Sequence, residues 1–239
     1  MKKNILRLLF ISTLVILTSI SVFNLSNFIE ISEKINSEEI VKANDYFPIE
    51  SFIMIHQSIS TFEELCDPDG SNCLPVPVLR HTMSGTGSGV IVGEKDGKSL
   101  ILTAAHVCNG TESTSSTTDT LTMVYTMELT SGYGSEAIGT VLDLDLINDL
   151  CLVIADDYLG PGLDIAEAPP LLHEKIYTMS SPLGLAASLA VPVFDGYYVG
   201  EVSTLFIFTI PAAPGSSGSP IMNKDGEIIS IISAAAVSF

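Results

Sequence analysis

Three residues whose side chains can act together in acyl transfer occur in the order His106, Asp149 and Ser217. His106 ends the run "SLILTAAH", where small residues let a strand end turn tightly beside a cleft. Asp149 directly precedes the apolar run "LCLVIA", so its carboxylate can accept a hydrogen bond from an imidazole at a buried strand start. Ser217 lies in "GSSGSP", which is either an ordinary turn or a bend that presents a serine beside backbone N–H groups. A serine, a histidine and an aspartate are the residue types of a nucleophile, its base and the group that orients the base, but each signal is weak when taken alone.

Other residues of similar chemistry are assigned no catalytic role. Asp143 and Asp145 alternate with apolar residues and are expected to face solvent. A cysteine nucleophile at Cys108 or Cys151 is rejected because the chain has no G-x-C-G bend. The loop "DPDGSN" resembles part of a calcium loop but lacks the later ligands, so we interpret it as a turn. We expect neither a metal nor a cofactor.

The 239-residue chain is 46% hydrophobic and carries a formal net charge of −18. This length and composition support one or two compact domains with apolar cores. Nucleic-acid binding requires clustered lysine and arginine, so the acidity argues against nucleic acid as a partner. We interpret the acidity as a solvated, self-repelling surface that keeps the protein soluble.

The N-terminus has the pattern of an export signal. Lys2, Lys3 and Arg7 precede an uncharged, mostly apolar stretch over residues 8–23. A basic region followed by such a stretch predicts a secretory signal peptide or a signal anchor over residues 1–24, and both alternatives stay open. The denser basic residues on its N-terminal side place the remainder outside the cytoplasm. The protein is therefore expected to be secreted or periplasmic, or anchored in the membrane through residues 8–23.

In the rest of the chain, the pattern of apolar and polar residues changes near residue 76. Residues 25–75 include "NFIEISEKINSEEIVKA", whose apolar residues are near helical spacing, and predict a stalk or N-terminal extension. From "VPVLRH" onward, short apolar runs alternate with glycine and polar turns. This pattern indicates an all-β domain, an antiparallel barrel or sandwich. A break rich in glycine and proline near residues 160–170 divides the strands into two groups.

Taken together, the motifs resemble those of the trypsin-like (chymotrypsin-fold) serine peptidases. "TAAHVC", "NDLCLV" and "GSSGSP" resemble the family's histidine, aspartate and serine motifs, in the family's order. "GSGVIV", "SSPLG" and "KDGEIISI" resemble stretches of bacterial members, in the style of the HtrA and glutamyl-endopeptidase-like branches. The resemblance covers residues 76–239. It implies two antiparallel, six-stranded-type β-barrels, over residues 76–160 and 165–239, with the active site between them and a polypeptide as substrate.

The resemblance also implies a role for each motif residue. Ser217 attacks the scissile carbonyl, His106 takes and returns its proton, and Asp149 orients His106. The backbone N–H groups of Gly215 and Ser217 form the oxyanion hole. These roles predict a serine endopeptidase. The alternative is a catalytically silent relative that uses the same cleft to bind peptides or proteins.

The chain departs from the family pattern in three places. Ser216 stands where digestive members carry an aspartate, so activation through an ion pair with a new N-terminus is not available. Pro211 stands where basic-residue cleavers carry an acid, which predicts a preference for small or medium apolar residues before the cut. Residues Ser233, Ala234 and Ala235 are expected to pair with the substrate backbone. The chain stops at Phe239, so we expect one of two alternatives: the second barrel is open on one wall of the pocket, or the sequence is a fragment.

Export makes the four cysteines candidates for disulfides. Cys66 and Cys73 enclose a polar, turn-rich loop that a local disulfide could close. Cys108 lies two residues after His106, and Cys151 lies two residues after Asp149. A hydrogen bond between His106 and Asp149 would therefore bring the two cysteines near each other. The alternative for Cys108 and Cys151 is two separate buried thiols.

Overall fold

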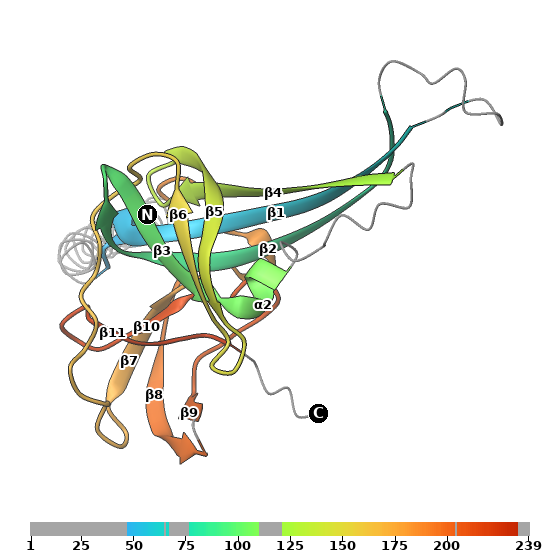
Figure 1. Ribbon diagram of the computed structural model, residues 1–239. Helices are drawn as coiled ribbons and strands as arrows, with labels where there is room; N and C mark the ends of the chain where they lie inside the picture. Colours follow the sequence, from blue (N-terminus) through green and yellow to red (C-terminus); the bar gives the residue numbers. More distant parts are fainter. Residues whose placement is uncertain (1–46, 65, 67–76, 110–120, 204, 234–239) are drawn as a thin grey trace, which may run out of the picture. The chain divides into compact units, whose positions relative to one another are not determined.

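The computed structural model describes residues 47–64, 66, 77–109, 121–203 and 205–233. Residues 1–24, for which we predicted a signal peptide or anchor, lie outside this part. Within the described residues no helix is long and apolar enough to cross a membrane. The described chain is mostly β-structure, and the described residues belong to one compact unit (Figure 1).

The first body is a closed barrel of six antiparallel strands in the order β1-β2-β3-β6-β5-β4. Its strands alternate buried and more exposed residues, as β6 does in "LCLVIA", because one face of each strand packs into the barrel. The core consists mainly of aliphatic side chains, including Ile53, Ile91, Ile101, Leu129 and Val153. The bounds of the strands are β1 Phe52–Glu63, β2 Val78–Lys95, β3 Lys98–Ala104, β4 Leu121–Ser131, β5 Glu136–Asp145 and β6 Leu150–Ala155.

The barrel begins earlier than the sequence analysis placed it. The short 3-10 helix η1 (Ile49–Ser51) leads into β1, which pairs with β2 on one side and β4 on the other. Residues 52–63 are thus a barrel strand rather than part of a stalk. Their pairing partners, on β2 and β4, come later in the sequence, at residues 78–90 and 121–131. Local periodicity therefore did not reveal them.

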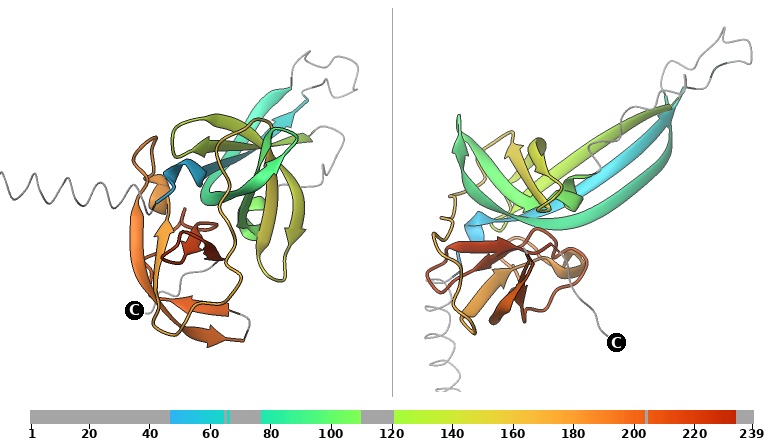
Figure 2. Two further views of the ribbon diagram at one scale, coloured as in Figure 1. Left: turned by 90° about the vertical axis from the view of Figure 1, so that its left-hand side faces the viewer. Right: turned by 60° about the horizontal axis from the view of Figure 1, so that its bottom comes forward.

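Three strands of the barrel are longer than the barrel wall itself. β1, β2 and β4 continue together as a three-stranded arm away from the body (Figures 1 and 2). The pairing continues to the far end, where Glu63 of β1 pairs with Val78 of β2 and with Leu121 of β4. Against β2 the register shifts once, between Thr61 and Phe62. Beyond Ile55, every residue of β1 is exposed or half-buried.

The second body is an open five-stranded antiparallel sheet in the order β11-β10-β7-β8-β9, curled as a half-barrel. Its strands are β7 Lys175–Met179, β8 Val193–Val202, β9 Leu205–Phe208, β10 Pro220–Met222 and β11 Ile228–Ile231, and the 3-10 helix η3 spans Pro182–Gly184. Phe52 of the first barrel is fully buried in one cluster with Met179 and Met222 of this sheet. A single apolar cluster therefore joins the two bodies.

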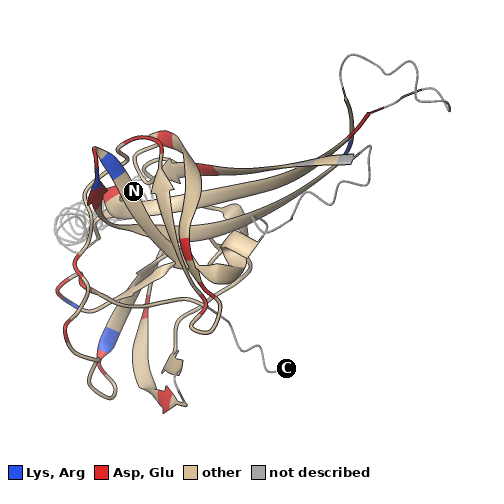
Figure 3. Cartoon of the chain, viewed as in Figure 1, with Lys and Arg blue, Asp and Glu red and all other residues tan. Residues whose placement is uncertain are grey.

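The all-β fold class is confirmed. The first barrel is closed and six-stranded as expected, and the second is an open, curled five-stranded sheet, which is one of the two alternatives expected for it. Carboxylates lie on many loops and strand ends of the described chain, whereas lysine and arginine occur at few positions (Figure 3). The acidity is thus spread over the molecule, as a solvated surface would be.

Candidate active site

His106 lies at the start of a four-residue helix, α2 (Ala105–Cys108), which follows β3 without a loop. A helix this short is not stable by itself, because fixing its first turn costs more free energy than its few hydrogen bonds contribute. Its first N–H groups also need partners from outside the helix. Here Asp149 supplies them. The N–H of Ala105 donates to the backbone oxygen of Asp149 (3.0 Å), and the N–H of His106 donates to Asp149 Oδ1 (2.9 Å).

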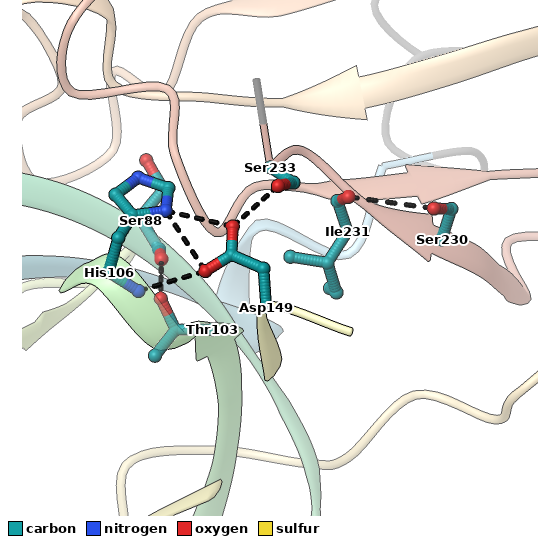
Figure 4. Close-up of polar contacts among 7 residues, drawn as sticks. All are labelled: Ser88, Thr103, His106, Asp149, Ser230, Ile231 and Ser233. Carbon is teal, nitrogen blue, oxygen red and sulfur yellow. Dashed lines mark hydrogen bonds and ion pairs between the residues drawn. The ribbon is translucent and has the colours of Figure 1, made fainter. Parts of the chain in front are cut away.

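The imidazole of His106 also points at Asp149 (Figure 4). Its Nδ1 lies 2.8 Å from Oδ2 and 3.1 Å from Oδ1. An ionised carboxylate only accepts hydrogen bonds, so Nδ1 carries the proton and Nε2 keeps its lone pair in the neutral ring. The His106 side chain is 43% exposed, which leaves Nε2 accessible to act as a base.

The backbone of Asp149 has an unusual conformation. Its φ of 53° is in the left-handed region, which aspartate and asparagine tolerate better than most residues. The hydroxyl of Ser233 donates to Oδ2 (Figure 4). Desolvation by partial burial raises the pKa of Asp149, but hydrogen bonds from Ser233 and from the backbone and ring of His106 outweigh it. The pKa of Asp149 is therefore lowered, and the carboxylate stays ionised near neutral pH.

Ser217 lies in the sharp bend between β9 and β10, and its carbonyl accepts a hydrogen bond from the N–H of Ser88 on β2 (2.7 Å). This bend therefore joins the second body to the first barrel. Ser217 itself is half-buried. Among the described residues, its hydroxyl makes no hydrogen bond with the imidazole of His106.

The peptides of this bend are oriented by their carbonyl groups. The carbonyl of Pro214 accepts from the N–H of Leu183 (2.6 Å), and the carbonyl of Ser216 accepts from the N–H of Ser219 (3.0 Å). Because the N–H and C=O of a trans peptide point in opposite directions, the N–H groups of Gly215 and Ser217 face the other way. Within the described chain neither N–H has an acceptor. These are the two donors that the sequence analysis assigned to an oxyanion hole.

Glycine is required at two positions of the bend. Gly215 has φ +95°, and a Cβ there would collide with the carbonyl oxygen of Ser181. Gly218 has φ +85°, and a Cβ there would collide with the carbonyl oxygen of Ser88 and with Thr103 Oγ1. The bend can pack this closely against both neighbours only because these side chains are missing.

The predicted cysteine pairs have different outcomes in the structure. Cys108 and Cys151 form a disulfide with a Cα–Cα distance of 6.5 Å, and both are buried. It joins the end of α2 to β6. Of the other pair, Cys66 is disulfide-bonded, whereas Cys73 lies outside the described residues.

The predicted substrate-binding residues are only partly placed. Pro211 is exposed and half-buried Ala212 follows it. Ser233 directs its hydroxyl to Asp149, a contact that the sequence analysis did not anticipate. Ala234 and Ala235 lie outside the described residues.

A family model provides the deciding comparison. The model of the trypsin-like peptidase domain matches residues 87–231. The chain belongs to this family. The match includes the segments that carry His106, Asp149 and Ser217, whereas β1 lies before it.

The trypsin-like domain has curated relatives among the HtrA serine proteases. The serine protease Do-like HtrA of Bacillus subtilis is 29% identical over 163 residues, which are 63% of this chain and 33% of the relative. HhoB of Synechocystis sp. is 31% identical over 174 residues, which are 69% of this chain and 38% of the relative. The chain thus spans little more than a third of the length of these relatives.

Solved structures share the trypsin-like fold. Rv3671c of M. tuberculosis H37Rv, crystallised as a serine-to-alanine mutant in an inactive form, superposes with a TM-score of 0.52 at 12% identity. That match covers 79% of this chain and 77% of Rv3671c. The serine endoprotease of Yersinia pestis superposes with a TM-score of 0.50 at 19% identity, over 75% of this chain and 54% of that one. Identities this low speak to the fold alone.

Proposed function

We propose that the chain is a serine endopeptidase in which Ser217 is the nucleophile, His106 the general base and Asp149 the residue that orients the base. His106 Nε2 takes the Ser217 hydroxyl proton as Oγ bonds to the scissile carbonyl carbon, and returns it to the leaving amine. Water then hydrolyses the acyl-enzyme by the same route. The N–H groups of Gly215 and Ser217 stabilise the oxyanion, each donor lowering the barrier by about 3–4 kcal/mol.

One observation carries this proposal. The Nδ1 of His106 is held by an ionised carboxylate, and in the bend that carries Ser217 two backbone N–H groups, those of Gly215 and Ser217, have no acceptor among the described residues. A merely structural turn has no reason to leave two donors unpaired.

A fluorophosphonate probe tests the proposal directly. The full chain should become labelled and should cleave dye-labelled casein, and Ser217→Ala should lose both activities. Ser219→Ala is the matched control, because its buried hydroxyl has no partner among the described residues and lies two positions from Ser217. Casein cleavage by Ser217→Ala at the wild-type rate contradicts the proposal.

A second candidate, a catalytically silent domain that binds peptides in the cleft, is favoured by one observation. The Ser217 hydroxyl is not hydrogen-bonded to His106 in the described structure. Such bonds are often long without substrate and tighten in the Michaelis complex, so we rank the endopeptidase first. An unlabelled wild-type chain that still binds unfolded casein would identify the silent domain.

We also propose that the substrate residue before the cut is small or medium and apolar. Pro211 and the alanines after it carry no charge to pair with a basic side chain. A peptide library should show this preference, and cleavage mainly after arginine, lysine or glutamate would contradict it.

We further propose that the domain works outside the cytoplasm, either released or held by residues 8–23. The buried disulfide between Cys108 and Cys151 supports this, because such bonds persist in oxidising compartments. Fractionation of cells that express the full chain should recover it outside the cytoplasm, and its mass distinguishes a cleaved signal from an anchor.

A further inference from the structure

We propose that Ser88 is a positioning residue for this reaction: it holds the bend at Gly215–Ser217 in the conformation that turns both N–H groups toward the substrate oxyanion. The proposal rests on the endopeptidase function given above. Ser88 lies in β2, in the first barrel, and is fully buried. It has no contact with the reacting atoms in the mechanism, so it acts only through the bend.

The Ser88 side chain joins two loops of the second body. Its hydroxyl donates to the carbonyl oxygen of Gly215 (2.8 Å) and accepts from the N–H of Ser181 (3.1 Å). Its backbone N–H donates to the carbonyl oxygen of Ser217 (2.7 Å). One residue therefore binds the carbonyl groups of both residues whose N–H groups are the proposed oxyanion donors.

The hydroxyl fixes the peptide that lies between the two donors. The carbonyl oxygen of the Gly215–Ser216 peptide accepts from the Ser88 hydroxyl. The N–H of the same peptide, that of Ser216, donates to the carbonyl oxygen of Ala213 (2.8 Å). Gly215 has no side chain to restrict its rotation, so hydrogen bonds must define its conformation. Without the Ser88 hydroxyl, this peptide is held at only one end and can rotate, which would turn the flanking N–H groups away from the substrate.

Ser88 is itself rigidly placed. Thr103 Oγ1 donates to its carbonyl oxygen at 2.6 Å (Figure 4), and the neighbouring β2 residues pair with β1 in the closed barrel. The same carbonyl oxygen packs directly against Gly218. Removing the hydroxyl leaves the buried Gly215 carbonyl and Ser181 N–H without this partner. Leaving buried polar groups unpaired costs free energy, and this cost favours a rearrangement of the bend.

The test compares Ser88→Ala with Ser99→Ala in the full chain. Ser99 is equally buried in the same barrel, and its hydroxyl accepts from one backbone N–H, that of Leu159 (2.9 Å). Because loss of one oxyanion donor costs about 100- to 1,000-fold in kcat, loosening both should lower kcat of Ser88→Ala by at least about 10-fold. KM for dye-labelled casein should stay within about two-fold, since ground-state binding does not use the oxyanion hole.

The pH dependence of kcat separates positioning of the bend from a general disturbance. The midpoint of its acid limb should be the same in Ser88→Ala and wild type, because no contact of His106 or Asp149 is removed. Ser99→Ala should keep the wild-type kcat and the wild-type midpoint of the acid limb, even if urea unfolding shows that its free energy of unfolding is lower. Equal kcat values for Ser88→Ala and Ser99→Ala would overturn the proposal.

Two other results of this experiment are possible: the Ser88→Ala variant does not fold, or the wild-type chain is inactive. If Ser88→Ala does not fold, Ser88→Cys takes its place, because a thiol of similar shape is a weaker donor and acceptor; a wild-type kcat for Ser88→Cys then overturns the proposal and a reduced one supports it. If the wild-type chain neither reacts with the fluorophosphonate nor cleaves casein, the endopeptidase function fails and this inference falls with it. An active wild type with unaffected Ser88 variants refutes the role of Ser88 alone.

Discussion

At the scale of single residues, the carboxylate of Asp149 organises the candidate site. It accepts from the backbone N–H of His106, from the His106 ring and from the hydroxyl of Ser233. Because the ionised carboxylate accepts from Nδ1, it fixes the ring proton on that nitrogen. The three donors together keep the carboxylate ionised against the desolvation that raises its pKa. The activity should therefore depend on the carboxylate itself and not only on a side chain of that shape.

Replacing Asp149 with asparagine tests this dependence. Asparagine accepts the left-handed backbone at φ 53°, but its amide N–H₂ must face either the His106 N–H or Nδ1. With the amide N–H₂ facing Nδ1, the ring proton moves to Nε2, which can no longer take the Ser217 proton. We expect kcat for casein to fall by about 10⁴-fold. Asp143→Asn, at an exposed position on β5, is the control and should keep the wild-type rate. A matching loss in Asp143→Asn would attribute the effect to net charge instead.

Ser233→Ala should change how stability depends on pH. The Ser233 hydroxyl lowers the pKa of Asp149 in the folded chain, so it stabilises the fold while the carboxylate is ionised. That contribution is complete above the unfolded pKa of about 3.9 and is lost as the pH falls through the lowered folded pKa. Urea unfolding should show wild type more stable than Ser233→Ala at pH 7, with the gap narrowing toward pH 2. A gap that stays constant over this range would mean that Ser233 acts only by packing.

At the scale of elements, α2 and the start of β6 form one structural unit. The first N–H groups of α2 donate to Asp149, and its last residue, Cys108, is bonded to Cys151 of β6. β3, which leads into α2, pairs with β6 at the same level, Thr103 opposite Cys151. The proposed base and its orienting residue are thus joined by a strand pair, by hydrogen bonds and by a covalent bond.

Removal of this covalent bond should lower stability more than it changes geometry. The disulfide closes a loop with a sequence separation of 43 residues. Loop-closure entropy then predicts that Cys108→Ala/Cys151→Ala unfolds with a free energy about 4 kcal/mol below wild type. Urea unfolding of the double variant, compared with wild type under non-reducing conditions, measures this. Casein cleavage well below the urea transition should persist, because β3 and β6 remain paired. Equal unfolding free energies would show that the bond constrains nothing in the unfolded chain.

At the scale of the whole molecule, contacts between the two bodies assemble the site. Phe52 of β1 is buried with Met179 and Met222 of the second sheet, and Ser88 of β2 holds the bend that carries Ser217. The first barrel therefore supplies His106 and Asp149 and also shapes the segment that supplies the proposed nucleophile.

This division explains what sequence could and could not predict. His106, Asp149 and Ser217 lie in short motifs whose order resembles that of the family, so sequence marks them as candidates. The structure brings His106 and Asp149 into contact, and the role of Ser217 stays a prediction. The contacts of Ser88 and Ser233 join residues 127 and 84 positions apart. Sequence marked Ser88 only as part of the family-like stretch "GSGVIV" and Ser233 only as a substrate-binding candidate, and it indicated neither contact. β1 was missed for the same reason, since its partners come later in the chain. Features that depend on long-range pairing leave little local signal.

The role of β1 leads to a prediction about where the folded unit begins. A chain that starts at residue 76, the boundary suggested by sequence, lacks β1 and so leaves β2 and β4 without their shared partner. It also loses the buried side chains of Phe52, Ile53 and Ile55. Full burial of each is worth about 1.5–3 kcal/mol, which together approaches the 5–15 kcal/mol that a typical domain has in total. We expect this chain to show no cooperative thermal unfolding and no labelling at Ser217. A chain that starts at residue 47 is the control and should unfold cooperatively. Equal melting temperatures for the two chains would contradict the assignment of β1 as an essential strand of the barrel.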